Sequence, residues 1–147
     1  MFHVKHWYIM KNLDEYLDIL LELVKKSNEL NEVPVGALII SNEKIIGKGY
    51  NNRQSKFNVC GHAEINAIID AEKNLNDWRL NECILLSTLY PCELCQTVIK
   101  ETRIKEVYYI LDQKVIHKDN YNRIYFPGNK KIDEMQKIFT DFFINLR

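Results

Sequence analysis

Apolar residues recur along the first third of the chain with two different periods. Across residues 12–30 the leucines and Val24 lie three or four positions apart, which is the spacing of an amphipathic helix. Residues 33–40 are mostly apolar, as in a buried strand, and residues 44–50 could pair with them across a turn at 41–43. The pattern therefore predicts a helix followed by a β-hairpin.

The alternation of helix and strand continues through the middle of the chain. Helical spacing starts at His62 and again at Cys92, while apolar runs at residues 83–88 and 105–111 are typical of buried strands. Cys83 opens the first of these runs, so we expect it to be a small buried hydrophobic residue. This order is typical of a sheet covered by helices.

The C-terminal third contains one clear helix and one segment without a clear pattern. Residues 112–129 show neither period, although 123–126 are a candidate for a short fifth strand. Residues 132–146 are predicted to be a helix whose apolar face carries Ile132, Met135, Ile138, Phe139, Phe142 and Phe143. We therefore expect an α/β protein with a three-layer α/β/α fold, in which helices cover both faces of a mixed sheet of about five strands.

Composition fits a single domain that spans residues 1–147. Apolar residues make up 46% and charged residues 27% of the chain, which are ordinary values for a globular protein. No apolar stretch reaches membrane-spanning length and no leader is evident, so we expect a cytoplasmic protein without a membrane partner. Residues 1–10 fit no pattern. We expect them to be disordered or to precede the true start, with Met10 as an alternative initiation site.

Formal net charge is zero, but the charge is unevenly distributed. Residues 1–95 carry a net charge of −3 and residues 96–147 a net charge of +3. The basic C-terminal part is compatible with a nucleic-acid surface, yet a solvated helix face explains it equally well. Charge alone therefore does not establish a nucleic-acid partner.

The residues with the most specific chemistry are His62 and Glu64, followed by Pro91 and the pair Cys92 and Cys95. Histidine and cysteine are ligands that zinc prefers, and the two cysteines lie one helical turn apart on one face. Pro91 suits the start of their helix, whose N-terminus favours thiolates. Glu64 lies on another side of its helix from His62, so it need not bind the metal. The spacing predicts a zinc site with three protein ligands and one position open to water.

Such a site would be reactive because its charges cancel. Zinc with two thiolates and a neutral imidazole has no net charge, so a bound water would keep enough acidity to ionise near neutral pH. Glu64 could take that proton and return it to a leaving amine. The alternative of a structural zinc site needs a fourth ligand, for which Cys60 is the only nearby candidate. A disulfide framework is weaker still, because nothing indicates an oxidising compartment.

The motif matches the H-x-E…P-C-x-x-C signature of zinc-dependent nucleobase deaminases. Further similarity extends over nearly the whole chain, at residues 32–37, 46–51, 62–65, 78–80, 88–89, 91–92 and 141–143. On these segments the chain resembles the cytidine deaminase-like superfamily and, within it, the bacterial tRNA adenosine deaminases. The resemblance implies a zinc-dependent homodimer that hydrolyses adenosine to inosine at the wobble position of a tRNA anticodon.

By matching position, the resemblance implies that His62, Cys92 and Cys95 bind Zn²⁺ and that Glu64 carries the proton. It also implies a group of substrate contacts, with Asn51 on the target nucleoside, Val35 in the wall of the base pocket, and Phe142 and Phe143 beside the RNA. Pattern alone leaves other roles open for these residues. Asn51 fits a turn equally well, and the two phenylalanines fit core or dimer contacts. The other histidines lack ligand-like spacing and are expected at the surface: His3, His6 and His117.

The chain departs from the usual family pattern near the motif. Tyr90 stands where the family commonly has glutamate, residues 96–98 are bulkier than usual, and residues 110–115 replace a segment rich in glycine and alanine. Residues 62–68 also resemble deaminases of deoxycytidylate. Two alternatives therefore stay open beside an RNA adenosine deaminase. One is a deaminase of a free nucleotide, nucleoside or base, such as deoxycytidylate, cytidine or guanine. The other is a zinc-stabilised RNA-binding domain without activity.

Overall fold

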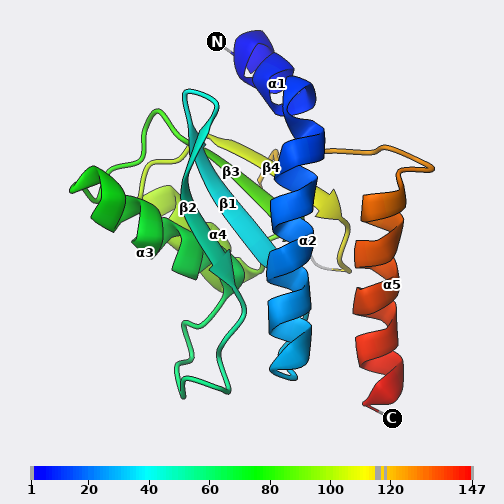
Figure 1. The fold of residues 1–147 in the computed structure, drawn as a ribbon. Coiled ribbons are helices and arrows are strands. Elements are labelled where there is room, and N and C mark those ends of the chain that lie inside the picture. Colours follow the sequence, from blue (N-terminus) through cyan, green and yellow to red (C-terminus); the bar gives the residue numbers. More distant parts are fainter. Residues whose placement is uncertain (1, 115–116, 118, 147) are drawn as a thin grey trace.

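Five strands form one sheet in the order β2–β1–β3–β4–β5 (Figure 1). The computed structural model describes residues 2–114, 117 and 119–146, with side chains from His6 onward. The strands are β1 (Gly36–Ser41), β2 (Lys44–Tyr50), β3 (Ile84–Leu89), β4 (Glu106–Leu111) and β5 (Asn122–Arg123). β1 is antiparallel to both of its neighbours, whereas β3, β4 and β5 are parallel. The predicted mixed sheet is therefore confirmed.

Helices cover both faces of the sheet, which confirms the predicted three layers. The helices are α1 (Phe2–Lys11), α2 (Leu13–Glu29), α3 (Ala63–Leu75), α4 (Glu93–Glu101) and α5 (Lys130–Asn145). α2 packs beside α5 on one face of the sheet, and α3 lies with α4 on the other (Figure 1). The N-terminal ends of α3 and α4 carry the residues of the predicted zinc site.

The N-terminal segment corrects the expectation of disorder, because residues 2–11 form α1. Asn12 joins α1 to α2, and its side-chain amide donates a hydrogen bond to the Tyr8 carbonyl oxygen at 3.0 Å. Ile9 is fully buried in the core. Apolar residues lie all around α1 and not along one face, so the sequence shows no helical period there. Whether Met10 is the true start stays a prediction.

A two-residue turn joins β1 to β2 at the predicted place. Asn42 and Glu43 both have positive φ, at 49° and 67°, as a type I′ hairpin turn requires. The Tyr16 hydroxyl of α2 donates a hydrogen bond to the Glu43 carbonyl oxygen at 2.7 Å. This contact fixes the hairpin to α2.

Two glycines of β2 let α3 lie directly against the sheet. A Cβ at Gly47 would overlap the Ala67 carbonyl oxygen, and one at Gly49 would overlap the Ala63 carbonyl oxygen. Glycine is therefore needed at both positions for the close approach of a second backbone. Because Ala63 is the first residue of α3, the contact at Gly49 determines where the helix that follows His62 begins.

The edge of the sheet differs from the prediction more than its centre does. β1, β3 and β4 are buried almost completely because helices cover both of their faces. β5 covers only Asn122–Arg123, one residue earlier than the predicted strand and shorter. In α5, Met135 is buried, while Ile138 and Phe139 are partly buried against the core. None of the helices described is both long and apolar enough to cross a membrane.

Candidate metal centre and active site

Two helix starts bring the predicted zinc ligands together. His62 is the N-cap of α3 and Cys92 the N-cap of α4, each just before the first turn, and Cys95 lies buried within the first turn of α4. The ligand atoms of these three side chains all lie within 4.8 Å of one another. Cys92 Sγ is 3.7 Å from His62 Nδ1. The three residues are therefore positioned to bind one metal ion.

Contacts among these donors shift the pKa values of the two thiols in opposite directions. A hydrogen bond from Cys95 lowers the pKa of the Cys92 thiol to about 4. The same contact raises the pKa of the Cys95 thiol, and the contact with Cys92 raises the pKa of the His62 imidazole. One thiolate is thus already favoured, and a coordinating thiol loses its proton outright. One imidazole and two thiols are a donor set that fits zinc.

The structure does not support the alternative of a closed, four-ligand site. Among the described residues, the group that could hold a metal consists of His62, Cys92 and Cys95. Cys60, the candidate fourth ligand, is exposed and lies outside this group. Three protein ligands leave one position for water, as in catalytic zinc sites.

Glu64 is buried beside the ligands, with only 5% of its surface exposed. Burial is the main cause that raises the pKa of its carboxyl group to about 7. A carboxyl group with this pKa can both accept and release a proton near neutral pH. Glu64 thus has the properties of a proton carrier, although its role stays a prediction.

A cavity of about 590 Å³ contains this chemistry, a volume within the usual range of small-molecule sites. His62, Glu64 and Cys92 all line it. So do the four residues that were predicted to contact the substrate: Val35, Asn51, Phe142 and Phe143. The structure therefore brings these residues together around one cavity, while their contact with substrate stays a prediction.

Asn51 has a second task, because its side chain connects two parts of the cavity wall. Its Oδ1 accepts a hydrogen bond from the Ala63 backbone N–H at 2.7 Å, at the start of α3. Its Nδ2 donates to the Val33 carbonyl oxygen at 2.9 Å. Asn51 therefore holds the helix start that carries His62, whatever it contributes to substrate binding.

Comparison with known proteins agrees with this site. The sequence pattern of the cytidine and deoxycytidylate deaminase zinc-binding region matches residues 10–111, which include all three ligands and Glu64. The chain belongs to this deaminase family. His62, Cys92 and Cys95 would hold the zinc ion, which would supply Lewis-acid activation of a water molecule. The deaminase keeps Glu64 in the wall of the same cavity, where little of its surface is exposed.

Individual relatives and solved structures are similar over most of the chain. A tRNA-specific adenosine deaminase of Buchnera aphidicola (subsp. Schizaphis graminum) is 33% identical, covering 92% of this chain and 97% of the relative. A structure solved in work on tRNA:A34 deaminases is 24% identical, with a TM-score of 0.69 over 76% of this chain and 98% of that one. Guanine deaminase from Bacillus subtilis is 23% identical, with a TM-score of 0.62 over 84% and 91%. The two structures show that the fold is shared.

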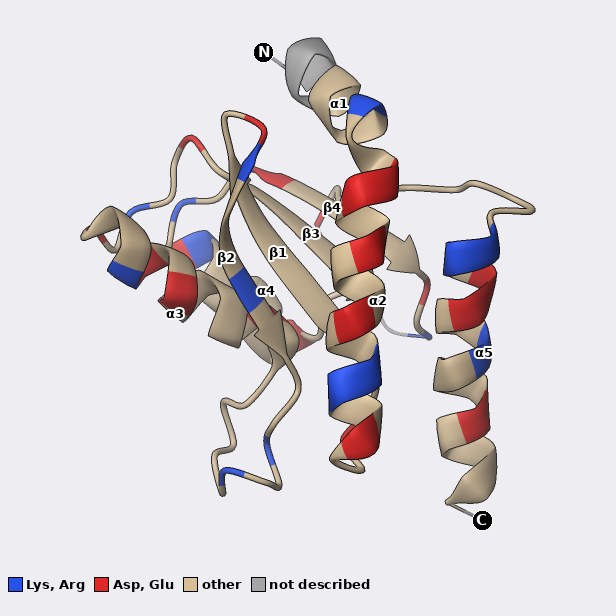
Figure 2. Cartoon of the chain, in the orientation of Figure 1, with Lys and Arg blue, Asp and Glu red and all other residues tan. Residues whose placement is uncertain are grey.

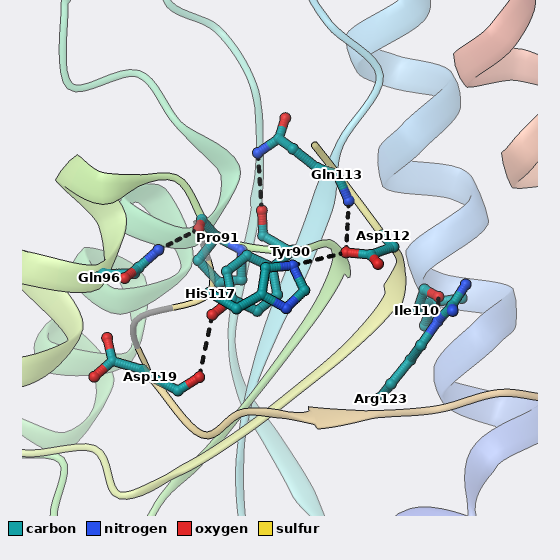
Figure 3. Close-up of polar contacts among 9 residues, drawn as sticks. All are labelled: Tyr90, Pro91, Gln96, Ile110, Asp112, Gln113, His117, Asp119 and Arg123. Carbon is teal, nitrogen blue, oxygen red and sulfur yellow. Dashed lines mark hydrogen bonds and ion pairs between the residues drawn. The ribbon is translucent and has the colours of Figure 1, made fainter. Parts of the chain in front are cut away.

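The structure also accounts for Tyr90, which replaces the usual glutamate before Pro91. Its ring is buried and stacks on His117, with centroids 3.9 Å apart and planes inclined by 5°. Its hydroxyl donates to the Asp119 carbonyl oxygen, and its own carbonyl accepts from Gln113 Nε2, both at 3.2 Å (Figure 3). Tyr90 therefore contacts Gln113, His117 and Asp119, which all belong to the loop that follows β4.

His117 is exposed, as predicted, and it also contacts Tyr90 and Asp112. Its side chain is 38% exposed, but its ring covers Tyr90 and its Nε2 lies 2.9 Å from Asp112 Oδ1 (Figure 3). The Tyr90 contact joins residues that are far apart in sequence, so no local pattern could have revealed it. His6 is exposed, as predicted, whereas His3 lies outside the described side chains.

Sequence reasoning missed several polar residues of the cavity wall, among them Arg53 and Gln113. Gln113 belongs to the segment at 112–129, which shows no clear apolar pattern. Arg53 lies in the loop just before His62, and that position could have marked it as a neighbour of the site.

Proposed function

We propose that this chain is a hydrolytic deaminase that converts adenosine to inosine at the wobble position of a tRNA anticodon. The observation that carries the substrate assignment is the relationship, at 33% identity over almost the full length of both chains, to a tRNA-specific adenosine deaminase. The open three-ligand site and the buried Glu64 support the reaction type. An unpaired base in an anticodon loop is also inexpensive to extrude into a cavity.

In this proposal the catalytic work of the chain is a proton transfer by Glu64. Glu64 takes a proton from the attacking water and returns it to the amino nitrogen of the base, which leaves as ammonia. The water oxygen becomes the carbonyl oxygen of inosine, and the second proton of the water ends on ring nitrogen N1 of the base. Glu64 lines the cavity in which the base would lie, and the raised pKa of its carboxyl group suits both transfers.

We also propose that the protein acts as a homodimer in the cytoplasm, where a tRNA substrate is available. The outer sides of α3 and α4 carry half-exposed apolar residues, among them Ile69 and Leu94. Apolar side chains of this kind suit a contact with a second copy. Sedimentation at several protein concentrations tests this: a single monomeric species throughout would refute the dimer.

The substrate assignment is tested by parallel incubations of the zinc-loaded protein. The substrates are tRNA with adenosine at the wobble position, cytidine, deoxycytidylate and guanine. The proposal predicts inosine in the tRNA and little ammonia from the small molecules. Ammonia from a small molecule alone would make the chain a free-nucleotide or free-base deaminase. RNA binding without any product would make it a zinc-stabilised RNA-binding domain.

A further inference from the structure

One wall of the cavity is a loop between β2 and α3, residues 52–61, which we name the wall loop. Arg53, Gln54 and Gly61 of this loop line the cavity together with His62, which follows it directly. Any substrate that places a base near His62 must therefore pass close to the wall loop. What this loop exposes bears on what the substrate can be.

Phe57 lies in the wall loop with 97% of its surface exposed. Its φ is 51°, in the left-handed region that bulky residues rarely adopt. A single exposed apolar residue is ordinary, but an exposed aromatic ring on strained backbone is not. Neither feature stabilises the protein by itself, so both indicate a contact made with another molecule.

The exposure of Phe57 is built into a well-bonded loop. Glu32 is buried, and its carboxylate accepts hydrogen bonds from the backbone N–H groups of Gln54 at 3.2 Å and Ser55 at 2.8 Å. Two backbone hydrogen bonds of 2.9 Å then close the loop, from Asn58 to the Arg53 carbonyl and from Asn52 to the Gly61 carbonyl. The protein thus holds the Phe57 ring outward on an organised backbone.

The charge of the wall loop points to an anionic partner. Arg53 and Lys56 are its charged residues, and it has no acidic residue. In Figure 2 this loop, which hangs below the sheet, carries blue segments and no red one. Within the described parts of the chain, neither Arg53 nor Lys56 forms an ion pair. An aromatic ring that accompanies unpaired cations is a combination that binds single-stranded nucleic acid.

We propose that the wall loop is the docking surface for the nucleotides that flank the target base in single-stranded RNA. One flanking base stacks on the Phe57 ring, and the adjoining phosphates lie near Arg53 and Lys56. This inference rests on the proposed RNA substrate and deepens it, because it assigns the recognition of flanking nucleotides to named residues. A second copy of the chain would be the other occupant of an exposed apolar ring, but the unpaired cations favour RNA.

The test measures binding and turnover of an RNA stem-loop that carries the wobble adenosine. Phe57→Ala should weaken binding and raise KM roughly 5- to 100-fold, the range for loss of one base–aromatic stack. The saturated rate, kcat, should change little, since Phe57 is not among the residues that line the cavity. Phe57→Tyr keeps a stacking face and should restore binding. Phe57→Leu keeps an apolar side chain without that face and should not.

Three controls separate this role from others. Val59→Ala removes an exposed apolar group of the same loop that has no π-face, and it should leave binding unchanged. Lys56→Gln should weaken binding and reduce its dependence on salt. Thermal melting of Phe57→Ala should match the wild-type protein, because the ring is exposed.

Several outcomes would overturn the inference. They are unchanged RNA binding in Phe57→Ala, full rescue by Phe57→Leu, or a change in sedimentation that shows Phe57 to lie between two copies of the chain. The proposed function fails separately, if the wild-type protein binds the stem-loop but makes no inosine. In that case weaker binding by Phe57→Ala still supports the wall loop as an RNA surface. A wild-type protein that does not bind the stem-loop at all would overturn both.

Discussion

Replacing Asn51 with alanine should destabilise the protein, because the Asn51 side chain holds the start of α3. The change removes the 2.7 Å hydrogen bond from the Ala63 N–H and the 2.9 Å hydrogen bond to the Val33 carbonyl oxygen. Ala63 is fully buried, so its N–H loses a partner that water replaces poorly. A lost helix cap costs about 0.5–2 kcal/mol and an unsatisfied buried group about 1–3 kcal/mol. We expect the free energy of unfolding to fall by about 2–4 kcal/mol.

Urea denaturation measures this loss, and thermal melting should show a fall in Tm of roughly 5–15 °C for a domain of this size. Asn51→Asp keeps an acceptor for the Ala63 N–H but loses the donor to Val33, so its loss should be intermediate. Asn74→Ala is the matched control, because Asn74 also donates to a backbone carbonyl, at 2.7 Å, but at an exposed site. Asn74→Ala should cost less than about 1 kcal/mol. Equal losses in Asn51→Ala and Asn74→Ala would refute the structural role of Asn51.

Substitutions at four further positions test other parts of the structure. Glu64→Gln should reduce kcat by at least about 10²–10⁴-fold while zinc content by elemental analysis stays at the wild-type level; near-normal turnover would exclude Glu64 as the proton carrier. Cys92→Ala should lose zinc and melt at a lower temperature, because metal binding is coupled to folding; retained stoichiometric zinc would contradict the ligand assignment. Gly49→Ala should lower both Tm and kcat, since its Cβ would overlap the Ala63 carbonyl oxygen, and a wild-type melting curve would show that α3 can shift without cost. Tyr90→Ala should lower the free energy of unfolding by about 3–5 kcal/mol, as for other buried aromatic rings. Tyr90→Phe loses only the 3.2 Å hydrogen bond of the hydroxyl and should cost about 1 kcal/mol. A loss in Tyr90→Phe as large as that in Tyr90→Ala would contradict the packing role of the ring.

The elements that the sequence predicted well are those whose pattern is local. β2 was predicted at its observed residues, and α2 begins and ends within one residue of the predicted helix. The zinc ligands were also predictable, because zinc chemistry restricts them to few residue types at short spacings. In such segments, the spacing of apolar residues follows directly from which faces of the helix or strand are buried.

The features that escaped prediction depend on contacts between distant parts of the chain. α1 shows no apolar face, so the sequence pattern did not predict this helix. In the structure it contributes Ile9 to the core. The sequence could not predict that the Asn51 amide connects Val33 to Ala63. These two residues come together only in the folded chain, where the segment before β1 lies near the start of α3. Sequence reasoning therefore gave Asn51 a substrate role and missed its structural one.

The loop after β4 illustrates the same limit. The sequence identified Tyr90 as a departure from the family pattern but could not say what replaces the glutamate. In the structure the Tyr90 ring is buried at this place and stacks on His117. The Tyr90 carbonyl oxygen accepts a hydrogen bond from Gln113, which lines the cavity. Neither partner has a recognisable pattern of its own, and both lie more than twenty residues beyond Tyr90.

The central claim is that this zinc site deaminates the wobble adenosine of a tRNA through Glu64. The most direct measurement is nucleoside-resolved mass spectrometry of a tRNA with adenosine at the wobble position, after incubation with the zinc-loaded protein and, in parallel, with Glu64→Gln. The account predicts inosine at the wobble position with the wild-type protein and none above background with the variant. Unchanged adenosine at that position with the wild-type protein, under conditions in which it binds the tRNA, would contradict it.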